Sequence, residues 1–445
     1  MKTAIGRLLA WATFLAAVCG CSSYLPLPLE KHPQGKADVE QLRHDAPVPA
    51  VLGIEDVAVL ALQNNPELLA ARAQHGVAQA QLLAAGILPN PSLGASYAFL
   101  LGGPGSAAAL SASITQDIRS IVLISNRRDT ARAAASGVDA GVVWQEWQTL
   151  AKARLLATDV IEGERQIELL HDAAELLRDR LARSRHALAD GDTTLAAQVP
   201  DLVAAADLRR QFDELVRVQA GRRRDLAAFL GLAPQAPLRL SDRIGLAALD
   251  LDAVRRELPG LADRRPDLVA LQLGYRAQEE RVRGAILAQF PLFSLGVAGG
   301  RDTSNIRTLG PQITLDLPIF DRNQGNIAIE RATRQQLHDE FSARLFAARS
   351  EALTLLADQA LLRDQYRERT AQLGEMEAAA RGADEALRAG DLDERGWVDL
   401  LAARNAKKLE IVAMEQNLLD QQVAISLLVG AGMPPVSFHP SGDVP

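Results

Sequence analysis

The chain of 445 residues carries 55 acidic and 48 basic residues, which gives a formal net charge of −7. This balance argues against nucleic acid as a partner, because phosphate backbones are bound by clustered Lys and Arg side chains. Both cysteines, Cys19 and Cys21, lie close to the N-terminus. Removal of an N-terminal signal would leave a mature chain with no disulfide and no cysteine-based metal site.

Residues 1–20 have the organisation of a bacterial secretory signal peptide. Lys2 and Arg7 form a charged region, and an apolar stretch over 8–18 follows it. This stretch is shorter than the ~20 residues that a membrane-spanning helix needs. A small-residue cleavage site then ends at Cys21, in a pattern that resembles a bacterial lipobox. We therefore predict that Cys21 is the lipidated first residue of the mature chain; the alternatives are a plain signal peptide or a short anchor helix.

Residues 21–50 are predicted to form a lipidated, extended N-terminal arm, because they show neither a helical nor a strand pattern. The arm contains five prolines, Pro26, Pro28, Pro33, Pro47 and Pro49. Ser22, directly after Cys21, resembles the pattern of lipoproteins that are sent to the outer membrane. Loss of Lys2 and Arg7 with the signal leaves 46 basic residues (48 − 2) against 55 acidic ones, a charge of about −9.

The remainder of the chain repeats itself at an offset of 199 or 200 residues. The matched segments are 65–68 with 265–268, 114–118 with 313–317, 190–192 with 389–391, and 229–231 with 428–430. An offset this constant indicates one folding unit duplicated in tandem. The predicted organisation is a first structural repeat at 51–232, an inter-repeat linker at 233–262, a second repeat at 263–432 and a C-terminal tail at 433–445.

Each repeat is predicted to open with a helix, which spans about 54–86 in the first repeat. A β-hairpin is expected next, at about 92–118 in the first repeat and about 292–318 in the second. Leu93, Ala95 and Tyr97 alternate with serines and glycine in the first of these strands, which is the period of an extended chain. The predicted strands thus have one apolar face and one face of small and polar residues.

Two readings of such a hairpin are open. In a soluble sheet the apolar face would cover a core, whereas in a membrane barrel it would contact lipid and the other face would line water. The predicted export signal favours the barrel. Four strands per chain are too few to enclose a pore, so several chains would have to contribute strands.

Two very long helices are expected after the hairpins. Residues 127–189 and 323–389 contain no proline and keep a mostly three-to-four spacing of leucines, a pattern that predicts helices far beyond the usual ~11–12 residues. Gly191 and Gly390 are expected to end them. Partner helices are expected at about 195–230 and 396–430.

The lipobox, the tandem repeat, the paired hairpins and the paired long helices together resemble the TolC-type outer-membrane efflux channels. Two local motifs agree with this resemblance, RRPDL at 264–268 and LPIFDRNQGN at 317–326. The similarity covers nearly all of 50–432. It implies a mainly α fold with a small membrane β-barrel contribution, in which a homotrimer forms a 12-strand barrel and an α-helical tunnel through the periplasm.

The resemblance also implies a function without chemistry. The chain would be a lipid-anchored channel of the outer membrane that extends into the periplasm. It would serve a tripartite efflux system as a passive exit duct for substrates that an inner-membrane pump delivers through a periplasmic adaptor. No enzymatic activity, cofactor or metal ion is expected. The nature of the substrate (drug, metal ion or polypeptide) would be set mostly by the pump.

Asp399 is the one gate residue that the resemblance suggests. The segment GWVDLLAAR at 396–404 is similar to the family's helix near the closed periplasmic end, where acidic residues ring the constriction. Asp399 matches the first acidic position, but Ala402 occupies the second. A ring of three carboxylates would favour cations and resist close approach. The alternative is that Asp399 is a solvated helix residue.

Other functional classes are weighed against this one. A periplasmic coiled-coil tether or adaptor lipoprotein would share the long helices, and an exit duct for type I secretion of polypeptides would share the whole architecture. An envelope enzyme is disfavoured, because no nucleotide fingerprint, no catalytic cluster and no metal-ligand spacing of the histidines is found.

Overall fold

The computed structural model of the chain describes residues 24–32, 34–242, 244–246, 249–291 and 293–434. The chain divides into two compact units, the first ending at Gly35 and the second beginning at Lys36. The described residues of the first unit form no helix or strand, and their side chains are exposed. The predicted signal peptide, the lipidation site Cys21 and most of the predicted tail lie outside the described residues.

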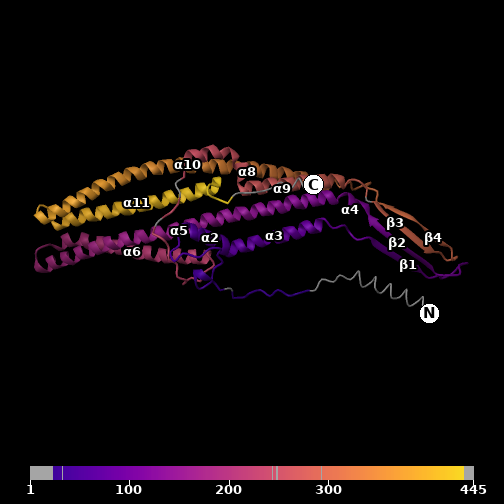
Figure 1. Ribbon diagram of the computed structural model, residues 1–445, viewed down its shortest axis with the longest axis horizontal. Coiled ribbons are helices and arrows are strands. Elements are labelled where there is room, and N and C mark those ends of the chain that lie inside the picture. The colour runs from indigo at the N-terminus through magenta and orange to yellow at the C-terminus, as the bar shows by residue number, and fades with distance from the viewer. Residues whose placement is uncertain (1–23, 33, 243, 247–248, 292, 435–445) are drawn as a thin grey trace. The chain divides into compact units, whose positions relative to one another are not determined.

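The second unit is mainly helical, with one small sheet (Figure 1). Its helices are η1 Val39–Gln41, α2 Ile54–Asn64, α3 Pro66–Ala85, α4 Ile118–Val122, α5 Ile124–Asp190, α6 Leu195–Phe229, α7 Leu251–Glu257, η2 Leu258–Gly260, α8 Leu261–Arg264, α9 Pro266–Leu287, α10 Gln324–Ala389 and α11 Glu394–Val429. Its strands are β1 Ser92–Ala98, β2 Ala109–Asp117, β3 Phe293–Arg301 and β4 Arg307–Leu315. Among the described helices, none combines the length and the apolar character needed to cross a bilayer.

The four strands form one antiparallel sheet in the order β1-β2-β3-β4. Each repeat contributes one hairpin, as the alternation predicted. The hairpins join through β2 and β3, where Ile114 pairs with Val297 and Ser113 with Ala298. Backbone hydrogen bonds therefore connect the two repeats within the sheet.

The long helices α5 and α10 have 67 and 66 residues, close to the predicted ranges. At a rise of about 1.5 Å per residue, each is roughly 100 Å long. Both end on a left-handed glycine, Gly191 at φ 85° and Gly390 at φ 82°. Glycine is favoured there because it lacks the Cβ that makes this conformation costly for other residues. The same C-cap therefore closes the equivalent helix in each repeat.

The single helix predicted at 54–86 is wrong. The chain forms two helices, α2 and α3, with Asn65 as the C-cap of the first and the N-cap of the second. The Asn65 side chain accepts a hydrogen bond from the Leu68 backbone N–H at 2.9 Å. Pro66 causes the break, because proline disfavours helical backbone in the residue before it and lacks the N–H that a continuing helix needs.

Two hydrophobic clusters occupy equivalent places in the two repeats. In the first, α2 packs against α5 and α6; in the second, α7 and α8 pack against α10 and α11. Equivalent buried residues include Leu226 and Ile425, which are 199 residues apart (425 − 226). Segments within the predicted arm and linker contribute to these clusters, among them Val39 and Val254.

The long helices carry the packing from the sheet to the far helix ends (Figure 1). On the sheet side of the clusters, α3 packs on α5, α5 on α9 and α9 on α10. Toward the other end, α6 pairs with α5, α11 pairs with α10, and α5 also packs against α11. Contacts between the repeats thus run along much of the second unit.

Replacing either of two glycines with alanine tests the capping role. Gly390 is the C-cap of α10, and Gly382 lies inside the same helix. Gly390→Ala should lower the free energy of unfolding by about 1 kcal/mol, because the left-handed conformation disfavours a Cβ. Gly382 lies inside α10 with open space around its Cα, so Gly382→Ala should raise that free energy by about 0.5–1 kcal/mol. Denaturant unfolding measures both variants, and shifts of the same sign would contradict the capping role.

Candidate functional site

The pairing register separates the sheet into two faces of opposite character. Residues that pair directly point to the same side. The apolar face contains Leu93, Ala95, Tyr97, Leu110, Ala112, Ile114, Leu295, Val297, Leu309, Pro311, Ile313 and Leu315. Polar residues occur on this face at its ends, namely Gln116, Arg301 and Arg307.

The opposite face is built from small and hydroxyl-bearing residues. Its members include Ser92, Gly94, Ser96, Ser111, Ser113, Thr115, Ser294, Gly296, Thr308, Gly310, Gln312 and Thr314. Hydroxyl groups pair across the strands, Ser92 with Thr115 at 2.6 Å and Ser96 with Ser111 at 2.8 Å. This face is suited to contact with water, whereas the other is suited to contact with an apolar medium.

The apolar face has no cover within the described part of the chain. The exposed fraction reaches 77% for Leu93, 80% for Leu309 and 69% for Ile313. The outer strands β1 and β4 each pair on one side only, so each leaves a row of backbone N–H and C=O groups free for a further strand. A sheet with an uncovered apolar face and two free edges is not a finished structure in water.

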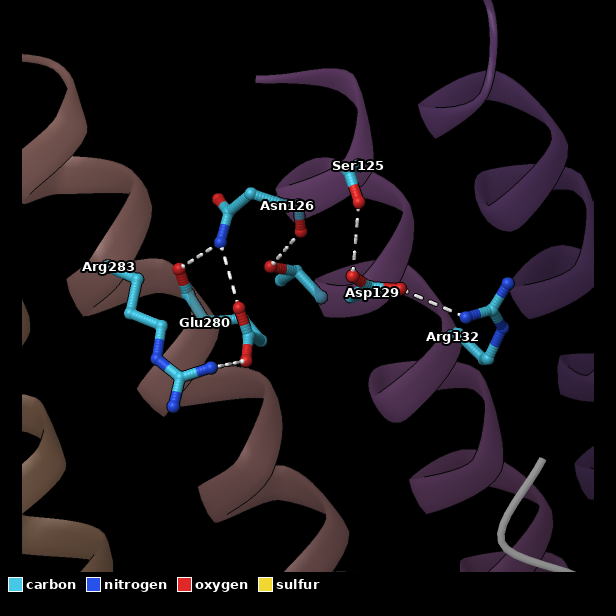
Figure 2. A network of polar contacts seen from close by, with 7 residues as sticks. Ser125, Asn126, Asp129, Arg132, Glu280 and Arg283 are labelled. Carbon is cyan, nitrogen blue, oxygen red and sulfur yellow. Dashed lines mark hydrogen bonds and ion pairs between the residues drawn. The ribbon is translucent and has the colours of Figure 1, made fainter. Parts of the chain in front are cut away.

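A polar network joins α5 to α9 close to the point where the strands end (Figure 2). The Asn126 side-chain amide donates to the Glu280 carbonyl oxygen at 2.8 Å and to its carboxylate at 3.0 Å. Arg283 donates to the other carboxylate oxygen of Glu280 at 2.6 Å. A Cβ at Gly284 would lie 2.4 Å from the Asn126 side-chain oxygen, so glycine is required for this approach. The network fixes the long helix α5, which follows the first hairpin, against α9, the last helix before the second hairpin.

Asp399 lies at the opposite end of the long helices, near the start of α11. Its carboxylate accepts a hydrogen bond from the Arg180 guanidinium of α5 at 2.5 Å, and its side chain is 65% exposed. Arg180 is 13% exposed and forms a second ion pair with Asp201 of α6 at 2.7 Å. Asp399 is therefore the accessible end of a cluster that joins the two repeats.

The carboxylates of Asp399 and Asp201 both stabilise the protonated form of Arg180. Burial lowers its pKa, but the hydrogen bonds and charges of Asp399 and Asp201 outweigh burial and raise the pKa above its ordinary value. Two further pairs lie beside it, Arg183 with Glu394 at 2.6 Å and Arg395 with Asp201 at 3.7 Å. Each pair bridges the helix pair of the first repeat and the beginning of α11.

The sequence suggested a role for Asp399, which stays a prediction, but it gave no indication of its partners Arg180 and Asp201. These residues sit among many exposed charges near the Gly191 turn, and nothing in their spacing marks them as buried. Asp393, another acidic residue of this region, caps α11 by accepting from the Gly396 backbone N–H at 2.8 Å. Among the described residues, no group of three or more His, Cys, Asp or Glu side chains could hold a metal ion.

Comparison with known proteins gives matches by structure. No family model matches the chain. No curated protein matches it. The outer membrane protein VceC from Vibrio cholerae aligns with a TM-score of 0.70 and 18% identity, over 86% of this chain and 97% of VceC. The CmeC outer membrane channel from Campylobacter jejuni aligns with a TM-score of 0.69 and 15% identity, over 93% of this chain and 95% of CmeC.

A third solved structure agrees with these two. The MtrE outer membrane channel from Neisseria gonorrhoeae, in its open state, aligns with a TM-score of 0.68 and 14% identity, over 91% of this chain and 98% of MtrE. Identities this low carry the fold and no more. The chain has the fold of the TolC-type outer-membrane channels, as the sequence motifs predicted.

Proposed function

We propose that the chain is the outer-membrane channel of a tripartite efflux system and acts there as a passive exit duct. The observation that carries this proposal is the four-stranded sheet, with an uncovered apolar face, a hydroxyl-rich face and two free edges. Lipid would cover the apolar face, and water would hydrate the hydroxyl-rich face. Strands from further copies of the sheet would form hydrogen bonds with the free edges.

Three copies meet all of these requirements together. Four strands from each of three chains give a closed barrel of twelve, in which β4 of one copy pairs with β1 of the next. The long helices of each copy would then line a common tunnel below the barrel. An acyl group at Cys21 would add a second membrane attachment to each chain.

The free ends of the helix pairs are the proposed contact point for a periplasmic adaptor, and through it for an inner-membrane pump. The energy for transport would come from the pump, because a passive duct supplies none. A polypeptide exit duct for type I secretion would use the same barrel and tunnel, and differs in the partner at the helix ends. The tether or adaptor lipoprotein is the weaker alternative, because it leaves the apolar face and both sheet edges without partners.

A single arginine placed on each face of β4 tests the membrane role. Ile313→Arg puts a charge on the proposed lipid face, at a cost of about 2–4 kcal/mol per chain near the bilayer centre. We expect it to abolish the fraction of protein that resists urea extraction from outer membranes. The adjacent substitution Thr314→Arg faces the proposed lumen. It should leave insertion intact and shift ion preference in planar bilayers toward anions.

These two variants differ by one position on the same strand and introduce the same side chain. Equal insertion of both would show that the apolar face does not meet lipid. Equal failure of both would show that β4 tolerates no charge on either side, and the assignment of a water-filled lumen would be lost.

We also propose that Asp399 contributes to the gate at the helix ends. Asp399→Ala should raise single-channel conductance or reduce cation preference, because it removes both the exposed carboxylate and its bond to Arg180. Asp364→Ala is the control, since Asp364 is an exposed carboxylate of α10 paired with Arg367 one turn away. Single-channel currents of Asp399→Ala identical to those of wild type would remove Asp399 from the gate.

A further inference from the structure

A group of carboxylates lies between the two repeats, where α5 faces α11, and the proposed channel function does not use it. Its members are Asp159 and Glu162 of α5 and Asp420 of α11. Glu162 is fully buried, with a side chain that is 0% exposed. Asp420 is partly buried, but one of its carboxylate oxygens is inaccessible to solvent.

The positive charges near this group are fewer than its negative charges. Arg165 donates to Glu162 at 2.8 Å and to Glu415 at 3.2 Å, so two carboxylates share one guanidinium. The charge of Arg222 on α6 acts on Asp420, but the Arg222 guanidinium donates a hydrogen bond to the Asp159 backbone carbonyl oxygen at 3.1 Å. Tyr366 of α10 also lies near Glu162 and Arg165, and Glu164 pairs with Arg223 on the side of Gln219.

Hydrogen-bond donors are also in short supply there. Gln416 donates to an oxygen of Asp159 at 2.5 Å. One buried oxygen of Glu162 and one of Asp420 accept no hydrogen bond from a described residue, and the nearby amide oxygens of Gln219 and Gln421 are in the same position. These four oxygens are acceptors, and the unpaired hydroxyl of Thr158 is the one potential donor among the unpaired buried atoms of this stretch of α5. A proton on a carboxyl group would supply a further donor to the cluster.

Burial and neighbouring charges raise the pKa of both Asp420 and Glu162. Burial, and then the charge of Asp159, raise the pKa of Asp420 to about 6, and Arg222 offsets only part of this. Burial also raises the pKa of Glu162, although Arg165 opposes the shift. Uncompensated negative charge at a partly buried interface has this effect because ionisation there costs hydration and adds repulsion.

We propose that Asp159, Glu162 and Asp420 form a proton-binding site that takes up a proton in mildly acidic solution and then holds α5 and α11 together more tightly. The same two helices carry Arg180 and Asp399 at their ends. Proton binding at this site would thus stabilise the contact between the repeats. This proposal depends on the chain's own packing and stands apart from the channel function.

The direction of the pH effect follows from linkage. A group whose pKa is higher in the folded state than in the unfolded state contributes stability that is fully present below the unfolded pKa. For Asp420 that contribution is lost as the pH rises from about 4 toward its folded pKa of about 6. With that pKa we expect Asp420 to be mostly protonated at pH 5 and mostly ionised at pH 7.5.

Infrared titration of the full-length, detergent-solubilised protein tests the site. Wild type should gain the carbonyl stretch of a protonated carboxyl group between pH 7 and pH 5.5. Asp420→Asn should lose this component, because asparagine cannot take up the proton. Asp358→Asn is the matched control, since Asp358 is an exposed carboxylate of α10, and it should retain the component.

Thermal unfolding gives a second readout on the same proteins. Asp420→Asn should unfold a few degrees above wild type at pH 7.5, and the difference should vanish near pH 4.5. If Asp420→Asn does not fold, Asp159→Asn replaces it; removal of the neighbouring charge should move the infrared midpoint to lower pH. An unchanged infrared component in the Asp420→Asn protein, or in the Asp159→Asn protein when that replaces it, overturns the proposal.

Discussion

The four-stranded sheet is the constraint on which the rest of the structure depends. Its register places nearly all of its large apolar side chains on one face, and no described segment covers them. Its two outer strands leave backbone groups free. Hydrogen bonding within the described part of one chain removes neither defect, whereas an apolar surrounding together with neighbouring strands would remove both. The proposed assembly in a membrane would supply both at once.

The long helices make the two ends of this unit mechanically continuous. Helix α5 carries Asn126, bound to α9 near the sheet, and some fifty residues further along it carries Arg180, bound to α6 and α11. The first hydrophobic cluster and the carboxylates Asp159 and Glu162 lie between these points on the same helix. Contacts between the repeats at three levels therefore act on one continuous helix.

The sequence predicted the parts of this fold that depend on local pattern. Strand alternation located both hairpins, and Gly191 and Gly390 located the ends of the long helices, because backbone chemistry dictates these features residue by residue. The break at Asn65 was missed, although Pro66 signals it. Two features depend on how distant segments pack, namely the pairing of β2 with β3 and the burial of Arg180 and Asp201. The periodicity of the sequence does not predict such long-range contacts. Cys21 stays a prediction, because it lies outside the described residues.

Native mass spectrometry of the detergent-extracted protein tests the central claim most directly. The account predicts one dominant species that contains three chains, each beginning at Cys21 and carrying acyl groups. Three copies are the number that we propose to close the free edges of the sheet into a barrel wide enough for a duct. A stable monomer would leave four strands with open edges, and a dimer would give at most a barrel of eight strands whose interior is filled by side chains. Either result would contradict the barrel of twelve strands and the duct that depends on it.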